Sequence, residues 1–184
     1  DIAGHTVTGH GQFETGKLTE SWQAQWIAAA HQQRADDAQD APLLRKCFEL
    51  KDTPQRARLY ICSPGYFDAF INGQPTSDEL LTTPFTRYDS TLLYCTYDVT
   101  DQVQSGSNAI GVTIGNGWYN CFTAEIWNSR EATWRHVPKL VAELHVAYAD
   151  GTQQIIATDG TWKSTRGPIT FNGIRNGEHY DARL

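Results

Sequence analysis

The chain has 184 residues, of which 20% are charged, and its formal net charge is −6. This length suits one domain with an apolar core, and six Trp, eight Tyr and seven Phe exclude a disordered acidic chain. The sequence has no basic run, which argues against a nucleic-acid partner, and no apolar run of about 20 residues, which argues against a membrane span. We therefore expect a soluble globular domain that is rich in tryptophan.

Alternating apolar and polar residues predict a series of short strands. These strands are expected at 42–51, 56–63, 66–71, 92–99, 108–114, 140–148, 153–157, 161–164 and 169–171. Asn72-Gly73 and Asp150-Gly151 predict tight hairpin turns, because these residues tolerate turn backbones with positive φ. Strands at roughly ten-residue intervals, with no sustained period of 3.6, predict an all-β sandwich or barrel.

One segment has a different pattern. Residues 20–34 place Trp22 and Trp26 four apart and are rich in Ala and Gln. On local grounds this composition favours an amphipathic helix.

The four cysteines are Cys47, Cys62, Cys95 and Cys121. No CxxC pair is present, so a structural zinc site is not expected. The first three lie in alternating apolar stretches, where a reduced cysteine packs as a small buried apolar residue. The even count is compatible with one or two disulfides, but the spacing requires none.

Seven sequence blocks, in order, resemble the N-terminal region of bacterial α-L-rhamnosidases. They are WQAQWI, PLLRKCFEL, ARLYICSPGYFDAFINGQ, TRYDSTLLYCTYDVTD, NAIGVTIGNGWYN, YADGT and GEHYDARL. The resemblance implies an antiparallel jelly-roll β-sandwich of the galactose-binding type over residues 19–184. It implies that residues 1–18 are the remnant last strand of a preceding fibronectin-like module. It also implies an extended Trp22–Ile27, which we favour over the helix.

The resemblance implies no catalytic residue in this chain. The family hydrolyses terminal α-L-rhamnosides with inversion, and its carboxylate pair lies in an α/α barrel much further along the enzyme. An inverting glycosidase needs two carboxyl groups roughly 6.5–9.5 Å apart, and the sequence gives no reason to select a pair. We expect the remaining carboxylates to cap turns or face solvent: Asp68, Asp78, Glu79, Asp89, Asp98 and Asp101.

We therefore expect an accessory domain that is inactive alone and that recognises carbohydrate or shapes the approach of substrate. Its partners would be L-rhamnose-containing glycans, the α/α barrel and neighbouring β-sandwiches. The alternative is a purely structural docking module with no ligand of its own.

The main candidate for a sugar site is the loop that follows the strand at 108–114. Trp118 and Tyr119 provide aromatic faces for sugar C–H groups, and Asn116 and Asn120 provide amides for hydroxyls. Further candidates are Trp127 and Trp134. In the competing interpretation Trp118 plugs one end of the sandwich and the two asparagines cap turns.

Arg87 is a further candidate, since a guanidinium offers a fixed fork of donors to vicinal hydroxyls. The alternative is a simple ion pair with Asp89. His145 alternates with Glu143 opposite the apolar face of its strand and is therefore expected to face solvent.

We expect no cofactor. Some rhamnose-binding modules similar to this region hold Ca²⁺, although no DxDxDG loop is present here. The chain has no initiator methionine, which fits a processed secretory precursor, and so the periplasm or the exterior, as well as it fits an excised fragment.

Overall fold

The computed structural model describes residues 8–11, 13–123 and 127–184. These residues form eleven strands and three short 3₁₀ helices. The strands are β1 (Leu43–Leu50), β2 (Arg56–Cys62), β3 (Tyr66–Ile71), β4 (Gln74–Pro75), β5 (Cys95–Asp98), β6 (Gly106–Gly115), β7 (Val141–Ala147), β8 (Gln153–Ala157), β9 (Lys163–Thr165), β10 (Ile169–Gly173) and β11 (Gly177–Tyr180). The helices are η1 (Ala35–Asp37), η2 (Thr100–Gln102) and η3 (Ser129–Glu131).

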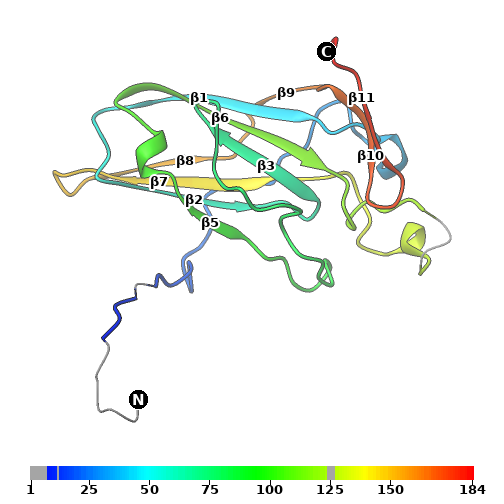
Figure 1. Cartoon of the computed structure of the whole chain (residues 1–184), viewed down its shortest axis with the longest axis horizontal. Coiled ribbons are helices and arrows are strands. Elements are labelled where there is room, and N and C mark those ends of the chain that lie inside the picture. Colours follow the sequence, from blue (N-terminus) through cyan, green and yellow to red (C-terminus); the bar gives the residue numbers. More distant parts are fainter. Residues whose placement is uncertain (1–7, 12, 124–126) are drawn as a thin grey trace.

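The strands form two layers and a small end sheet (Figure 1). One layer has the strand order β4-β3-β6-β1-β9 and the other has β5-β2-β7-β8. All of these pairs are antiparallel, and β10 and β11 pair at one end of the molecule. The antiparallel β-sandwich predicted from the sequence is confirmed.

The core lies between the two layers because each strand alternates its side chains between faces. On β6, Ile110, Val112 and Ile114 are buried, and they belong to one cluster with Leu59 of β2 and Leu144 of β7. Burying each large aliphatic side chain contributes about 1.5–3 kcal/mol. This interior fixes the register of the strands, and therefore the direction in which the outer faces and end loops point.

Both predicted hairpins are present. Asn72 and Gly73 have φ of 50° and 82° and connect β3 to β4, and Gly151, with φ of 82°, lies in the turn from β7 to β8. Asparagine and glycine adopt this left-handed backbone more readily than other residues. Strands β4 and β11 were not expected from the sequence, because β4 has two residues and β11 has no buried position.

The local prediction of a helix over 20–34 is wrong, and the extended form implied by the resemblance is correct. Ile27 exchanges two backbone hydrogen bonds of 2.9 Å with Leu140, and the backbone N–H of Gln25 donates to the carbonyl of Thr158 at 2.8 Å. These sheet-like bonds, with Ile27 packed against the core, outweigh the helical propensity of alanine and glutamine.

Residues 13–25, which we call the N-terminal segment, run along the outer face of the four-stranded layer. Residues 8–11 and 13–18 contain no strand, while residues 1–7 and 12 lie outside the described part of the chain. The expected remnant of a fibronectin-like module over residues 1–18 therefore stays a prediction.

All four cysteines are free thiols. Cys62 and Cys121 are buried, and burial raises the pKa of Cys62 to about 12. Cys95 is half-buried against the core. Cys47, expected to be buried, is exposed because it lies at an outward position of β1.

Candidate functional site

The loop at 116–120 is built around two buried asparagines at the end of β6. The Nδ2 of Asn116 donates to the carbonyl of Asn172 at 2.9 Å, and its backbone N–H donates to the Oδ1 of Asn172 at 2.7 Å. The Nδ2 of Asn120 donates to the Oδ1 of Asn116 at 2.7 Å and to the carbonyl of Ala35 at 2.9 Å. Both side chains are fully buried, so these two amides hold the loop in place and face away from solvent.

Gly117 allows the sharp turn between these asparagines. Its φ is 50°, and a Cβ on it would lie 3.2 Å from the backbone nitrogen of Tyr66. A residue with a side chain would be strained there and would crowd the start of β3. The loop conformation therefore depends on glycine at this position.

Six aromatic residues gather beside this loop and form what we call the aromatic cluster: Phe85, Tyr88, Trp118, Tyr119, Trp127 and Trp134. The rings of Trp118 and Trp127 stack with centroids 6.0 Å apart and planes 30° apart. Phe85 makes edge-on contacts with Tyr88, Trp118 and Trp134. Tyr88 and Tyr119 are buried at the base, and burial raises the pKa of both hydroxyls.

The aromatic cluster opens onto a hollow of about 360 Å³. Phe85, Trp118, Trp127 and Trp134 line the hollow, together with the polar residues Asn128, Ser129 and Glu131. The side chain of Trp127 is 85% exposed. Sugars are bound where aromatic faces meet their C–H groups and a few polar groups reach their hydroxyls, and this hollow offers both.

Arg87 does not line this hollow. Its Nε donates to Asp89 Oδ1 at 2.8 Å, where the chain makes a turn. Asp89 Oδ2 also accepts a hydrogen bond from Thr133. The predicted pairing of Arg87 with Asp89 is therefore present. Of the predicted site residues, the structure brings Trp118, Trp127 and Trp134 to one hollow, with Tyr119 beneath them.

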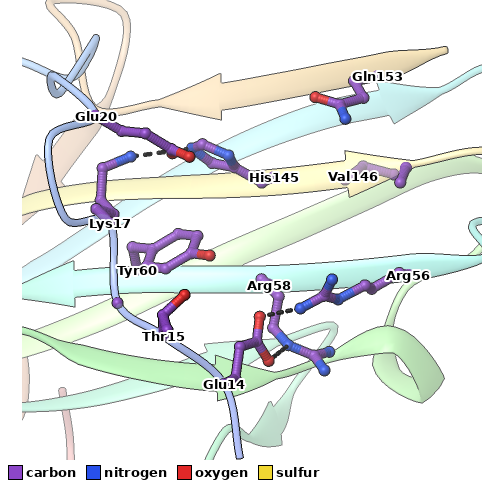
Figure 2. Close-up of a pocket in the computed structure, with 12 residues that line it drawn as sticks. Glu14, Thr15, Lys17, Glu20, Arg56, Arg58, Tyr60, His145, Val146 and Gln153 are labelled. Atoms are coloured by element: carbon purple, nitrogen blue, oxygen red, sulfur yellow. Dashed lines mark hydrogen bonds and ion pairs between the residues drawn. The ribbon is translucent and has the colours of Figure 1, made fainter.

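A second, polar cleft of about 360 Å³ lies under the N-terminal segment (Figure 2). Its floor is formed by Arg56, Arg58 and Tyr60 of β2 and His145 of β7, and its roof includes Glu14 and Lys17. Sequence reasoning missed this cleft. Alternation shows which face of a strand points away from the core, but not whether another segment covers that face.

Glu143 lies beside this cleft and is fully buried, contrary to the expectation that its side of β7 faces solvent. Its carboxylate accepts hydrogen bonds from Lys17 Nζ at 2.7 Å, His145 Nε2 at 2.8 Å and the backbone N–H of Ala24 at 2.9 Å. Burial alone would raise the pKa of Glu143, but these hydrogen bonds outweigh it and lower the pKa to about 2. His145, which was expected to face solvent, is half-buried because Lys17 of the N-terminal segment lies against it.

A third hollow, of about 570 Å³ and mostly apolar, lies between the outer face of β3 and β6 and the β10–β11 hairpin. Leu80 and Leu81 line it and are largely exposed. Within the described residues, no three His, Cys, Asp or Glu side chains gather as a metal site. No helix of that same part of the chain is long and apolar enough to cross a membrane.

Residues 52–184 match the family described as the alpha-L-rhamnosidase N-terminal domain. The chain belongs to this family. It is 38% identical to an alpha-L-rhamnosidase of Formosa agariphila, over 94% of this chain and 19% of that protein.

Two solved structures are similar in fold as well as in sequence. The alpha-L-rhamnosidase of Dictyoglumus thermophilum is 34% identical with a TM-score of 0.78, over 90% of this chain and 19% of that one. The alpha-L-rhamnosidase of Streptomyces avermitilis, complexed with L-rhamnose, is 36% identical with a TM-score of 0.73, over 80% of this chain and 14% of that one. The chain thus spans about a fifth or less of the rhamnosidases it matches.

Proposed function

We propose that this α-L-rhamnosidase N-terminal domain is a non-catalytic accessory module of a longer enzyme and that it holds rhamnose-containing glycans at the aromatic cluster. The exposed ring of Trp127, stacked on Trp118 beside a sugar-sized hollow, carries the proposal. A ring this exposed contributes little to the core, whereas it offers a flat apolar face to a ligand. The L-rhamnose complex of the Streptomyces avermitilis relative supports the choice of sugar.

The hollow suits a 6-deoxy sugar in particular. A methyl group and ring C–H groups can pack on Trp118, Trp127 and Phe85, while Asn128 and Glu131 at the rim can bond hydroxyls. Asn116 and Asn120 are left out of this contact because their polar groups are buried in the loop framework. Trp134 completes the wall.

Titration with L-rhamnose and with rhamnosylated oligosaccharides, followed by tryptophan fluorescence and calorimetry, tests the proposal. We expect millimolar or tighter binding, with a change in indole emission. Trp127→Ala should weaken the affinity at least tenfold, whereas Trp22→Phe, a substitution remote from the hollow, should leave it unchanged. Absence of binding by the unmodified chain would overturn carbohydrate recognition. Parallel titrations with and without Ca²⁺ show whether the cation contributes.

Independent hydrolysis is not part of this proposal. We expect the purified chain to leave an aryl α-L-rhamnoside intact under conditions in which a complete rhamnosidase cleaves it. Measurable turnover that co-purifies with the chain would contradict the non-catalytic role.

The apolar hollow beside Leu80 and Leu81 favours a second candidate function, structural docking onto the rest of the enzyme. Exposed apolar patches of this kind mark contact surfaces. Replacing both leucines with serine in the complete enzyme should then lower its thermal stability while leaving the isolated domain unchanged. An equal effect on both, or on neither, would contradict docking at this hollow.

A further inference from the structure

The polar cleft contains a carboxylate that belongs to the chain itself. Arg56 and Arg58 are two residues apart on β2 and therefore project from the same face. Glu14 lies between them, with one oxygen accepting from Arg58 Nε at 2.9 Å and the other from Arg56 Nη2 (Figure 2). Two guanidinium groups that converge on one carboxylate form a recognition arrangement of high geometric specificity.

Space remains beside this carboxylate. The cleft of about 360 Å³ is large enough to hold a monosaccharide, and its walls carry the hydroxyl of Thr15, the amide of Gln153, the ring of Tyr60 and the imidazole of His145. These groups can bond sugar hydroxyls or face ring C–H groups. The cleft thus combines a carboxylate position with hydroxyl-binding walls.

Glu14 can leave without detaching the N-terminal segment. The preceding residue, Phe13, is 93% exposed, and the side chain of Glu14 is itself 38% exposed. The firm attachment of the segment lies further along, where Lys17 is buried against Glu143. Ion pairs as exposed as that of Glu14 contribute little to stability, so an external carboxylate has only a weak internal competitor.

The charges that face the cleft favour an anion once Glu14 is displaced. Arg58 stays paired with Asp98 at 2.7 Å, and Lys17 stays paired with Glu143 at 2.7 Å. Arg56, whose ion-pair partner is Glu14, then has no carboxylate beside it among the ion pairs of the described residues. Glu20 also lines the cleft, and its charge opposes an anion placed near Lys17. The anionic group of a ligand is therefore best placed between Arg56 and Arg58.

We propose that this cleft binds a uronic acid residue of a glycan, with the uronate carboxylate replacing Glu14 between Arg56 and Arg58. The pyranose ring then lies in the space bounded by Thr15, Tyr60 and Gln153. A saccharide fits better than an acidic peptide, since the walls offer polar partners for several hydroxyls. The site is distinct from the aromatic cluster and does not rest on the function proposed for it.

Titration of the full chain with D-glucuronate, D-glucose and N-acetylglutamate α-amide, followed by NMR, tests this assignment. The α-amide keeps only the side-chain carboxylate free. Glu14→Gln removes the internal competitor, and we expect it to bind glucuronate about two- to fivefold more tightly than the unmodified chain. Glucose, which lacks the carboxylate, should bind at least tenfold more weakly than glucuronate. Binding should weaken as salt rises.

Arg58→Gln in the Glu14→Gln background should abolish the gain, while Arg166→Gln, an exposed arginine outside the cleft, should leave it intact. Thermal unfolding of each variant verifies that it is folded. Failure of Glu14→Gln to bind glucuronate would overturn the proposal. Binding of N-acetylglutamate amide as tight as that of glucuronate would show a general carboxylate site and overturn the sugar assignment. Trp127→Ala should leave glucuronate binding unchanged, which separates this site from the aromatic cluster.

Discussion

The aromatic cluster and the surface under the N-terminal segment differ in opposite ways from an average protein surface. At the aromatic cluster, large apolar rings are left open to solvent, and Trp127 is the most exposed of them. Under the N-terminal segment, a charged pair is enclosed, with Lys17 and Glu143 both buried. Exposed apolar rings stabilise a fold little, whereas buried ions are costly unless they are fully paired.

This difference separates ligand binding from stability in the two regions. The exposed ring of Trp127 can be removed at small cost to folding, because it buries little surface and the loop beside it is held by buried amides. Removing either side chain of the buried Lys17–Glu143 pair destabilises the fold, because the remaining charge is then buried without its partner. The predictions below test this contrast, from the largest expected effect to the smallest.

The largest effect is expected from breaking the buried pair. Lys17→Met leaves Glu143 buried with only His145 and backbone N–H groups as partners, and we expect it to lower the free energy of unfolding by about 3–5 kcal/mol. Lys51→Met is the matched control, since Lys51 pairs with Asp150 at an exposed site and should cost at most about 1 kcal/mol. Urea denaturation measures both. Similar losses for the two variants would contradict the contrast.

The pH dependence of stability should report the same pair. The pKa of Glu143 is lowered to about 2 in the folded state, so the unfolded state binds the proton more readily. The stabilisation is fully present above about pH 5 and is lost as the pH falls toward 2, with a total of about 3 kcal/mol. Denaturation midpoints of the unmodified chain and of Glu143→Gln, compared from pH 7 to 2, should converge at low pH. Parallel curves would refute this assignment.

An intermediate effect is expected from the loop framework. Asn120→Ala leaves the carbonyl of Ala35 and the Oδ1 of Asn116 without the amide donor they share, which should cost about 1–3 kcal/mol. Because the loop also positions Trp118, the near-ultraviolet circular dichroism of the aromatic cluster should change. An unaltered spectrum would mean that the rings are positioned without this amide.

The smallest effect on folding is expected at the exposed end of the aromatic cluster. Trp127→Ala should change the free energy of unfolding by less than about 0.5 kcal/mol, although we expect it to abolish most of the sugar affinity. Calorimetric unfolding together with rhamnose titration measures both quantities on one sample. A large loss of stability would show that Trp127 belongs to the core.

The sequence predicted the parts of the fold that depend on local alternation. The strand at 66–71 and the strand at 153–157 have the bounds of β3 and β8, because their buried and polar residues follow the pleat. It failed where distant segments decide the outcome. The extended path of residues 20–34 depends on pairing with Leu140 and Thr158, and no local pattern contains that information.

The same limit applies to the candidate sites. The Trp and Tyr residues after β6 identified the aromatic cluster, because so many rings near one loop are unusual. The burial of Asn116 and Asn120 depends on Ala35 and Asn172, which lie far away in sequence. The polar cleft could not be foreseen, since its roof comes from the N-terminal segment and its floor from β2 and β7.

The asparagine framework also bears on how such a module can acquire a new ligand. Asn116, Asn120 and Asn172 connect the loop after β6 to residues 35–39 and to β10 through main-chain groups and through one another. No ring of the aromatic cluster takes part in these bonds. The asparagine framework and the exposed ring of Trp127 are therefore separable, and exchanging that ring offers a route to altered sugar preference on an unchanged scaffold.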